Sequence, residues 1–349
     1  MTPDAPLRTA IAQLAAGRSL TAGESAEAFD VLMRGEATPA LAAALLMGLR
    51  IKGETAEEVA GAALALRRAM VRLESPDAPR AVDTCGTGGG RVGTLNLSTA
   101  AAFVVAGAGV PVAKHGNRSF TSRSGSADVL EALGVEISLP PGRASAVLAS
   151  AGLVFLFAPT YHPAMRHVGP IRRELGVPTI MNLLGPLVNP AGVTRQVIGV
   201  ADPGRAPLVA QALARLGAEH ALVLHADVGM DEVSPCGATA VWEVTDGRVD
   251  HWHFVPSDYG LDCDDLDGLA GGEPEENAEH IEALLGGRGE RSARCAVLLN
   301  AAAGLYVSGR GLTLGEAVAR AVTALDSGAA AAALERLRRA APRVAAVSP

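Results

Sequence analysis

The sequence predicts an α/β protein with a separate small all-α domain, in which a mainly parallel central sheet is flanked by helices. Two observations indicate this class. Residues 5–73 show helical periodicity without a strand pattern, and after residue 79 short apolar segments alternate with Ala- and Leu-rich segments. Buried parallel strands are short apolar runs, and their crossover helices cover the faces of the sheet. With 349 residues, 49% of them hydrophobic, the chain is long and apolar enough for two or three domains.

The N-terminal part is expected to form four helices with short turns. Apolar residues recur there at helical spacing, and Gly17, Gly35 and Gly53 mark the turns between the periodic segments. Thr38 followed by Pro39 predicts a helix start, because the first turn of a helix leaves its N–H groups unbonded and proline has none.

After the prolines in residues 76–79 the pattern changes to alternating strands and helices. The candidate parallel strands are residues 81–83, 110–114, 153–157, 196–200 and 220–225. Residues 239–257 alternate in polarity around Asp246-Gly247, which predicts antiparallel strands joined by a turn. The pattern is helical again from residue 277, and a terminal helix from residue 329 should stop at Pro342.

A glycine-rich loop follows the first candidate strand and leads into a helix. Five of the eight residues from 86 to 93 are glycine, so the backbone can bend sharply and approach a ligand closely. Asn96 or Ser98 should lie near the N-cap of the next helix, whose unbonded N–H groups favour an anion. A dinucleotide fingerprint is disfavoured, because no acidic residue follows about 20 positions later. A flexible glycine turn is the alternative reading.

A second polar loop follows the next candidate strand. Lys114, Arg118 and Arg123 stand there among five serine and threonine hydroxyls within residues 119–126. Cations and hydroxyl donors together suit phosphate or diphosphate. Because one strand–helix unit separates the two loops, we expect them to form one anion site.

Asp231 and Glu232 come soon after the strand that ends at His225. Open α/β sheets bind ligands beyond the carboxyl ends of their strands. Two adjacent carboxylates in a loop there can bracket one or two Mg²⁺ ions that bridge to phosphate oxygens. A solvated acidic loop is the alternative, and the two upstream loops favour the metal site.

An arginine-rich segment interrupts the α/β pattern. Arg166, Arg172 and Arg173 would lie roughly on one side of a single helix, where they could hold a carboxylate. Gly169-Pro170 should break that helix, and a solvated basic face is the alternative.

Two histidines and one cysteine lie close to these segments in the sequence. His115 and His162 flank glycine or proline, and each could shape a pocket or be a satisfied structural histidine. Cys85 has no evident base partner, so we assign it no nucleophilic role. The four cysteines form no C-x-x-C pair, which favours reduced thiols in a cytoplasmic protein over disulfides or a zinc site.

The bulk composition excludes several classes of protein. A net charge of −7 argues against a broad nucleic-acid surface, and 3% aromatic residues disfavour a base-stacking platform. The first residues form no secretory signal, and the longest apolar runs stop short of a membrane span. A soluble cytoplasmic protein is expected.

Seven ordered motifs, spread over nearly the whole chain, resemble the anthranilate phosphoribosyltransferase family. They are Cys85-Gly86-Thr87-Gly88-Gly89, Asn96-Leu97-Ser98-Thr99, Lys114-His115-Gly116-Asn117-Arg118, Ser124-Gly125-Ser126-Ala127-Asp128, His162-Pro163-Ala164-Met165, Asn182-Leu183-Leu184-Gly185-Pro186-Leu187 and Met230-Asp231-Glu232. The resemblance implies a Mg-dependent glycosyltransferase that moves the 5-phosphoribosyl group of phosphoribosyl diphosphate to the amine of anthranilate. Pyrophosphate is released in this second step from chorismate to L-tryptophan.

The resemblance also implies the organisation of the chain. A helical N-terminal domain over residues 1–73, completed by helices within 163–190, would stand against an α/β domain over 79–349 that binds phosphoribosyl diphosphate. A homodimer would form through the helical domain, without nucleic acid or membrane partners. The rival functions are a pyrimidine nucleoside phosphorylase, which shares the implied architecture, and a non-catalytic paralogue that binds nucleic acid. The paired acidic residues favour a metal–diphosphate donor over free phosphate.

Site residues follow from the resemblance by position. The phosphoribosyl diphosphate site would comprise Gly86, Gly89, Gly90, Thr94, Asn96, Leu97, Ser98, Thr99, Lys114, His115, Gly116, Asn117, Arg118, Ser119, Phe120, Thr121, Ser122 and Ser126. Anthranilate would meet Gly86, Asn117 and Arg172, and Mg²⁺, expected as two ions, would meet Ser98, Asp231 and Glu232. Lys114, Asn117 and Arg172 would be the catalytic residues.

The chain departs from the family pattern in the glycine loop. The family usually has Asp and Gly where this sequence has Gly90 and Arg91. A carboxylate near the diphosphate or its metal is thereby lost, and position 90 offers only its backbone. Asp231 and Glu232 remain to hold the metal.

Overall fold

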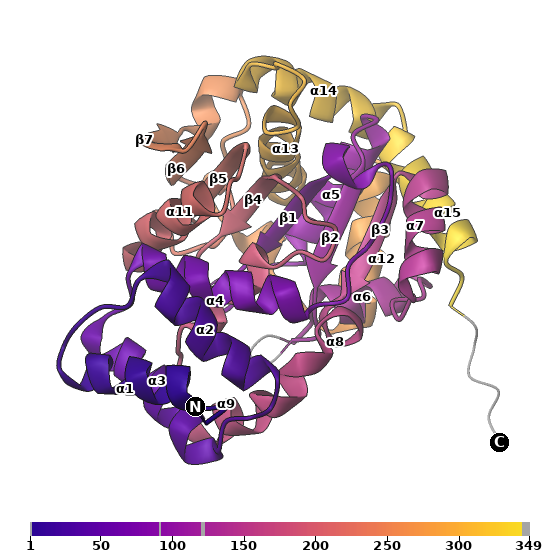
Figure 1. The fold of residues 1–349 in the computed structure, drawn as a ribbon. Helices are drawn as coiled ribbons and strands as arrows, with labels where there is room; N and C mark the ends of the chain where they lie inside the picture. The colour runs from indigo at the N-terminus through magenta and orange to yellow at the C-terminus, as the bar shows by residue number, and fades with distance from the viewer. Residues whose placement is uncertain (1, 91, 120–122, 344–349) are drawn as a thin grey trace.

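A computed structural model describes residues 2–90, 92–119 and 123–343 (Figure 1). The N-terminal part consists of α1 (Ala5–Ala15), α2 (Ala22–Met33), α3 (Pro39–Lys52) and α4 (Ala56–Ala69). The predicted start of α3 is confirmed, because the Thr38 hydroxyl accepts a hydrogen bond from the Leu41 N–H at 3.3 Å. Thr21 and Thr55 close capping boxes at the starts of α2 and α4, which satisfy N–H groups that the first turn leaves unbonded.

The seven strands of the described residues belong to one sheet. They are β1 (Val82–Gly86), β2 (Val112–Gly116), β3 (Leu153–Phe157), β4 (Arg195–Gly199), β5 (His220–Ala226), β6 (Thr239–Thr245) and β7 (Arg248–Phe254). Their order is β3-β2-β1-β4-β5-β6-β7, with parallel pairs from β3 to β5 and antiparallel pairs from β5 to β7. The predicted mainly parallel sheet and its antiparallel hairpin are confirmed. The strand order reverses at β1 and β4, so a crevice for ligands is expected at their carboxyl ends.

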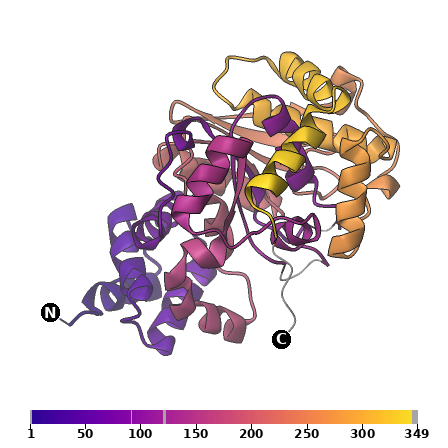
Figure 2. The ribbon, with the colours of Figure 1, turned by 90° about the vertical axis from the view of Figure 1, so that its right-hand side faces the viewer.

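Helices cover both faces of the sheet (Figures 1 and 2). The remaining α-helices are α5 (Leu97–Gly107), α6 (Ser126–Ala132), α7 (Pro141–Ala151), α8 (Ala158–Tyr161), α9 (Gly169–Leu175), α10 (Met181–Leu184), α11 (Ala206–Arg215), α12 (Pro274–Leu285), α13 (Arg291–Tyr306), α14 (Leu314–Asp326) and α15 (Ala329–Ala340). One core lies around α5, α13 and α15 on one face. The terminal helix α15 ends before Pro342, as predicted.

A second core joins the N-terminal helices to the other face of the sheet. It contains apolar side chains of α1–α4, α9, α10 and α11 together with Ile198 of β4 and Val223 of β5. Helix α2 approaches α4 so closely that a Cβ at Gly61 would lie 2.2 Å from the Ala22 carbonyl oxygen. Buried Glu54 also forms an ion pair with Arg205, which precedes α11. The helical part is therefore fixed against β4 and β5, beside the strand switch point.

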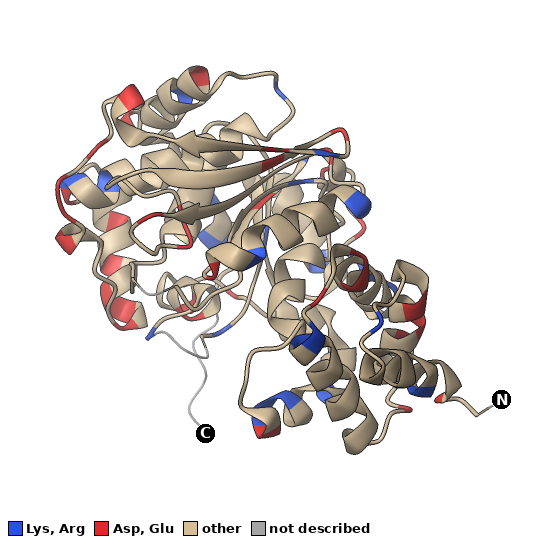
Figure 3. Ribbon diagram, turned by 90° about the vertical axis from the view of Figure 1, so that its left-hand side faces the viewer, with Lys and Arg blue, Asp and Glu red and all other residues tan. Residues whose placement is uncertain are grey.

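Charged residues of both signs are interspersed over the ribbon (Figure 3). In the described part of the chain, no single helix has the length and apolar character needed to cross a membrane; one bent pair, α14 with α15 at 66°, meets those criteria on length and composition only.

Candidate functional site

The acidic pair lies in the loop after β5, against the carboxyl end of β4. A Cβ at Gly199 would lie 1.6 Å from the Asp231 carbonyl oxygen, so only glycine permits this approach. The Glu232 carboxylate accepts one hydrogen bond from the Thr94 hydroxyl at 3.0 Å and another from the Ser98 N–H at 3.0 Å. The acidic loop thus meets the first turn of α5, a position that favours negative charge.

The two neighbouring carboxylates point to different elements. Asp231 faces the glycine loop, where a Cβ at Gly90 would lie 2.4 Å from its Oδ1 atom and a Cβ at Gly86 would lie 3.3 Å from its Oδ2 atom. Glu232 faces α5. A cavity of about 10 Å³ between them is lined by Ser98 and the deeper Asn300, among others. Such a space holds about one water or one small ion.

Partial burial of two adjacent carboxylates favours their neutral forms. Desolvation, followed by the charge of Asp231, raises the pKa of Glu232 to about 8. Desolvation also raises the pKa of Asp231. A divalent cation would remove this repulsion, and carboxylate and hydroxyl oxygens are the hard ligands that Mg²⁺ prefers. Among the described residues no third His, Cys, Asp or Glu completes a metal cluster, so diphosphate oxygens and water would supply the other ligands.

Lys114 reaches the same place from β2. Its side chain is buried, and its ammonium donates hydrogen bonds to the Thr84 carbonyl oxygen and, at 3.1 Å, to the Ser98 hydroxyl. Desolvation lowers the pKa of Lys114, whereas Asp83, Cys85 and Glu232 oppose this shift. The structure therefore brings together the predicted cation and the predicted metal ligands.

The glycine loop is fixed at both ends. The Thr87 N–H donates to the Gly199 carbonyl oxygen at 2.8 Å, and the Leu95 N–H donates to the Leu269 carbonyl oxygen at 2.8 Å. Between these ties Gly88 (φ 69°) and Gly89 (φ 85°) adopt the left-handed conformation that only glycine adopts readily. The loop conformation is thus set by its glycines and by its neighbours.

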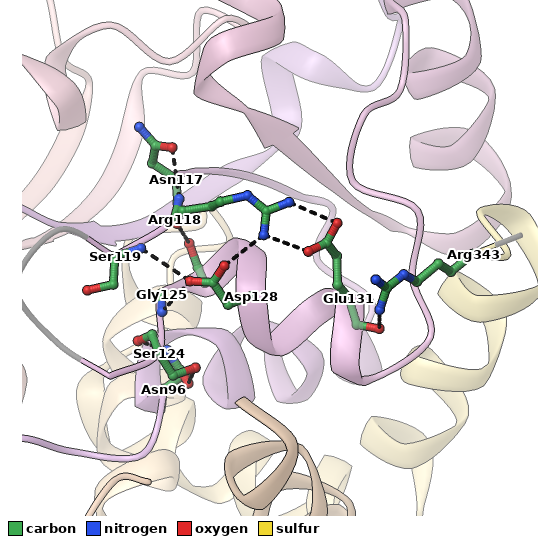
Figure 4. A network of polar contacts seen from close by, with 10 residues as sticks. Asn96, Asn117, Arg118, Ser119, Ser124, Gly125, Asp128, Glu131 and Arg343 are labelled. Carbon is green, nitrogen blue, oxygen red and sulfur yellow. Dashed lines mark hydrogen bonds and ion pairs between the residues drawn. The ribbon is translucent and has the colours of Figure 1, made fainter. Parts of the chain in front are cut away.

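Asn96 holds the N-cap position of α5, as expected, but its side chain does not cap the helix. Its amide donates to the Ser124 carbonyl oxygen at 3.1 Å, and its oxygen accepts from the Ser124 hydroxyl at 3.1 Å and the Asn277 amide at 2.9 Å. The two polar loops predicted from the sequence therefore meet through Asn96 (Figure 4). No local sequence pattern indicates the hydrogen bond with Asn277, which is 181 residues from Asn96 in the chain.

The other predicted donor-site residues divide into three groups. The Thr99 hydroxyl is buried and has no hydrogen-bond partner in the described part of the chain, whereas the Leu97 side chain packs in the core. Asn117 and Ser126 lie where the second loop enters α6: the Ser126 hydroxyl donates to the Asn117 carbonyl oxygen at 3.3 Å. The predicted residues Phe120, Thr121 and Ser122 lie outside the described ranges, as does Arg91, which departs from the family pattern.

Two histidines lie together behind the loops. The rings of His115 and His162 have centroids 5.1 Å apart, and desolvation lowers the pKa of His115 to about 3 and that of His162 to about 4. His115 Nδ1 lies 3.1 Å from the Gly185 carbonyl oxygen and must donate to it, which leaves Nε2 as an acceptor. Both Nε2 atoms are buried without partners among the described residues, and that of His115, as an acceptor, suits an N–H donor of a ligand. The sequence alone did not decide whether His162 shapes a pocket or is a satisfied structural histidine.

Asn300 is a residue that the sequence analysis missed. From α13 it accepts a hydrogen bond from the Val233 N–H at 3.0 Å and donates to the Val233 carbonyl oxygen at 2.9 Å. These bonds fix the residue that follows Glu232. An asparagine inside an Ala- and Leu-rich helix is the one sequence signal that could have indicated it.

The arginine-rich segment is broken where predicted. A short 3₁₀ helix (Pro163–His167) holds Arg166, and α9 begins at Gly169 and carries Arg172 and Arg173. Arg172 is half-buried, which lowers its pKa, and its guanidinium has no ion pair or hydrogen bond with the described residues. A half-buried, unpaired cation is available to a ligand carboxylate. Among the described residues no hydrogen bond joins Arg172 to Asn117.

Comparison with known proteins shows the family to which the chain belongs. Residues 8–70 match the glycosyl transferase family, helical bundle domain, and residues 78–331 match the glycosyl transferase family, a/b domain. The anthranilate phosphoribosyltransferase of Rubrobacter xylanophilus is 49% identical over 339 residues, which cover 97% of this chain and 98% of that protein. The enzyme of the same name from Rhodopseudomonas palustris is 50% identical over 330 residues, covering 95% of this chain and 96% of that one.

Solved structures give the same result. Anthranilate phosphoribosyltransferase from Thermus thermophilus superimposes with a TM-score of 0.89 at 45% identity, covering 95% of this chain and 98% of that one. The Saccharomyces cerevisiae enzyme in complex with PRPP and Mg gives 0.87 at 29% identity, with 97% and 98% coverage. These likenesses favour the transferase over the phosphorylase and the nucleic-acid-binding paralogue. The chain is a glycosyltransferase that belongs to the anthranilate phosphoribosyltransferase family.

Proposed function

We propose that this chain transfers the 5-phosphoribosyl group of phosphoribosyl diphosphate to the amine of anthranilate, with release of pyrophosphate, in L-tryptophan biosynthesis. The observation that carries this proposal is that Glu232 accepts hydrogen bonds from Thr94 and Ser98 while Asp231 faces the glycine loop. Structures of the yeast relative with PRPP and Mg and with 4-fluoroanthranilate support the substrates.

Ser98, Asp231 and Glu232 are proposed to hold Mg²⁺, as two ions. The donor set fits, because two half-buried carboxylates and a hydroxyl line one cavity and all supply the oxygen ligands that Mg²⁺ prefers. Bound Mg²⁺ would neutralise diphosphate charge and so stabilise the leaving pyrophosphate.

The donor is proposed to lie along the two polar loops and the first turn of α5. Loop N–H groups, the Thr99 hydroxyl and the buried ammonium of Lys114 would face its phosphates. The proposed donor-site residues with described positions are Gly86, Gly89, Gly90, Thr94, Asn96, Leu97, Ser98, Thr99, Lys114, His115, Gly116, Asn117, Arg118, Ser119 and Ser126.

The reaction is a displacement at the anomeric carbon of the ribose. The amine nitrogen of anthranilate forms the new bond to C1 as the bond from C1 to the diphosphate oxygen breaks, and the nitrogen then loses a proton. A neutral aromatic amine is already nucleophilic, so orientation matters more than a strong base. Gly86, Asn117 and Arg172 would orient anthranilate, with the arginine on its carboxylate, and Lys114 would stabilise charge on the leaving group.

We also propose how the domains of the chain are organised for this reaction. A helical domain (1–73, with the helices of 163–190) would close on the α/β domain (79–349) and exclude water from the reacting carbon. The chain would act as a homodimer joined through the helical domain, in the cytoplasm, without nucleic acid or membrane partners. Four cysteines without a disulfide support the location.

Consumption of anthranilate, followed by its fluorescence, tests the function. The signal should fall only when both phosphoribosyl diphosphate and Mg²⁺ are present. Persistence of the signal at every Mg²⁺ concentration, with a folded protein, would overturn the proposal.

Arg172→Ala is expected to raise KM for anthranilate about 30-fold, because a bidentate charge-assisted contact contributes about 2 kcal/mol. Arg173→Ala is the matched control, since Arg173 is an exposed neighbour on the same helix. Steady-state kinetics with anthranilate varied would measure both. An unchanged KM in Arg172→Ala would refute the assignment of this arginine to the carboxylate.

Gly90→Ala is expected to raise the Mg²⁺ concentration for half-maximal activity about tenfold, because displaced metal ligands cost affinity on this scale. The new Cβ would lie 2.4 Å from Asp231 Oδ1, so the carboxylate must move. Gly93→Ala is the matched control, because a Cβ there meets nothing within 4 Å. Equal Mg²⁺ dependence in both variants would show that the approach of Gly90 to Asp231 has no role in metal binding.

A further inference from the structure

Arg118 stands in the second polar loop, yet its guanidinium is bound by two carboxylates. Nη1 lies 2.8 Å from Asp128 Oδ1 and 2.6 Å from Glu131 Oε2, and Nη2 lies 3.0 Å from Glu131 Oε1 (Figure 4). The guanidinium carbon also lies 5.7 Å from the centre of the Phe157 ring. A phosphate would have to compete with two negative charges for this one cation.

Asp128 closes the loop as well as binding the arginine. Its Oδ2 atom accepts hydrogen bonds from the Gly125 N–H at 2.9 Å and from the Ser119 N–H at 3.2 Å. Gly125 packs so tightly that a Cβ there would lie 2.4 Å from the Ser119 nitrogen. The carboxylate therefore ties the point where the chain leaves Asn117 and Arg118 to the point where it enters α6.

The carboxylates stand on a helix that is fixed at its far end. Arg343 donates to the Glu131 carbonyl oxygen at 3.0 Å, and Arg338 of α15 donates to the Leu133 carbonyl oxygen at 2.6 Å. The Glu136 N–H donates to the Ala341 carbonyl oxygen at 2.8 Å. Helix α6 is thus anchored to the C-terminal part of the chain, so the main chain that carries Glu131 is held in place. The Glu131 side chain is 22% exposed.

We propose that Asp128 and Glu131 are positioning residues for the donor. Through Arg118 they hold the main chain of residues 117–119 in the conformation that receives the diphosphate, and the Arg118 guanidinium itself is not a phosphate ligand. This inference rests on the proposed function of the two loops. A bidentate arginine–carboxylate contact fixes orientation as well as distance, so it suits a loop that must be ordered before the ligand arrives.

Glu131→Gln tests the inference, because it keeps the shape of the side chain and removes its charge. KM for phosphoribosyl diphosphate should rise about tenfold, while kcat and KM for anthranilate stay within about twofold. Glu219→Gln, in the ion pair with Arg195, is the matched control and should change neither constant. Glu131→Asp keeps the negative charge, so its KM for phosphoribosyl diphosphate should rise less than that of Glu131→Gln. The double variant Arg118→Met with Glu131→Gln should have a KM for this donor no higher than that of Arg118→Met alone.

The same measurements distinguish a positioning role of Asp128 and Glu131 from direct binding of phosphate by Arg118. If the guanidinium binds phosphate, freeing it from Glu131 lowers KM for the donor or leaves it unchanged, while Arg118→Met raises it; this result would overturn the inference. Equal rises of both KM values with a lower unfolding midpoint would also overturn it, by showing a merely structural role. An inactive wild-type chain would instead refute the function on which the inference rests. If Glu131→Gln does not fold, Asp128→Asn is measured in the same way.

Discussion

Glu232→Gln is expected to lower kcat/KM for phosphoribosyl diphosphate about 1,000-fold, a loss typical of removing a group that holds a catalytic metal. The carboxylate accepts hydrogen bonds from Thr94 and Ser98 at the first turn of α5, and together with that of Asp231 it lines the cavity beside Ser98. The glutamine amide keeps the size of the side chain but carries no negative charge to neutralise the cation. Initial rates over a wide Mg²⁺ range would measure the effect, and excess Mg²⁺ should not restore the wild-type rate.

The same substitution should stabilise the protein when Mg²⁺ is removed with a chelator. The pKa of Glu232 is raised to about 8, so wild-type stability is lost as the pH rises from the unfolded value near 4.5 through 8. The glutamine has no proton to lose, and its free energy of unfolding at pH 8 should exceed that of the wild type by on the order of 2 kcal/mol. Denaturant titrations at pH 5 and pH 8 would show this. A wild-type stability that does not fall between these pH values would contradict the raised pKa of Glu232.

Lys114→Met is expected to lower kcat about 1,000-fold, the scale of losing a charge that stabilises the leaving group. The ammonium is buried, it donates to the Ser98 hydroxyl at 3.1 Å, and Asp83 and Glu232 are close enough to act on its pKa. Methionine retains the unbranched shape of the lysine stem without the cation. Rapid-quench measurement of a single turnover would report the chemical step directly.

The sequence offers a matched control for this variant, because Lys52 is its only other lysine. Lys52 is also shielded from solvent and forms an ion pair with buried Glu58 at 3.0 Å, within the helical part. Lys52→Met and Lys114→Met should both lower the unfolding midpoint, since the first leaves buried Glu58 without its ion-pair partner and the second removes a positive charge that acts on buried Asp83 and two hydrogen bonds. Only Lys114→Met should lower the single-turnover rate. A similar rate loss in both variants would indicate that it comes from instability.

Local patterns in the sequence were sufficient for the elements of the fold. The four N-terminal helices, the five parallel strands and the hairpin around Asp246-Gly247 all form where periodicity and turn residues predict them. Asp246 and Gly247 have φ of 51° and 76°, the values that a tight hairpin turn requires. These features depend on residues near in sequence, which is why composition and spacing determine them.

The chemical character of the site was also readable from the sequence. Ser98, Lys114 and Glu232 were each expected at an anion or metal site, and in the structure Ser98 forms hydrogen bonds with both Glu232 and Lys114. The Gly169-Pro170 break separated Arg166 from Arg172 as expected. Glycine, hydroxyl and charged residues indicate a class of ligand because the charge and the hydrogen bonds that each can offer follow from the residue type.

The partners of each side chain were decided by tertiary structure alone. Asn96 occupies an N-cap yet bonds Ser124 and Asn277, and Asn300 reaches Val233 across 67 residues. Arg118 was expected to face phosphate, and only packing of α6 against the loop shows its guanidinium on Glu131. Sequence determined which elements form and which chemistry they carry, because local sterics and side-chain type suffice for both. Strand order and helix packing decided which groups meet, because those contacts join residues far apart in the chain.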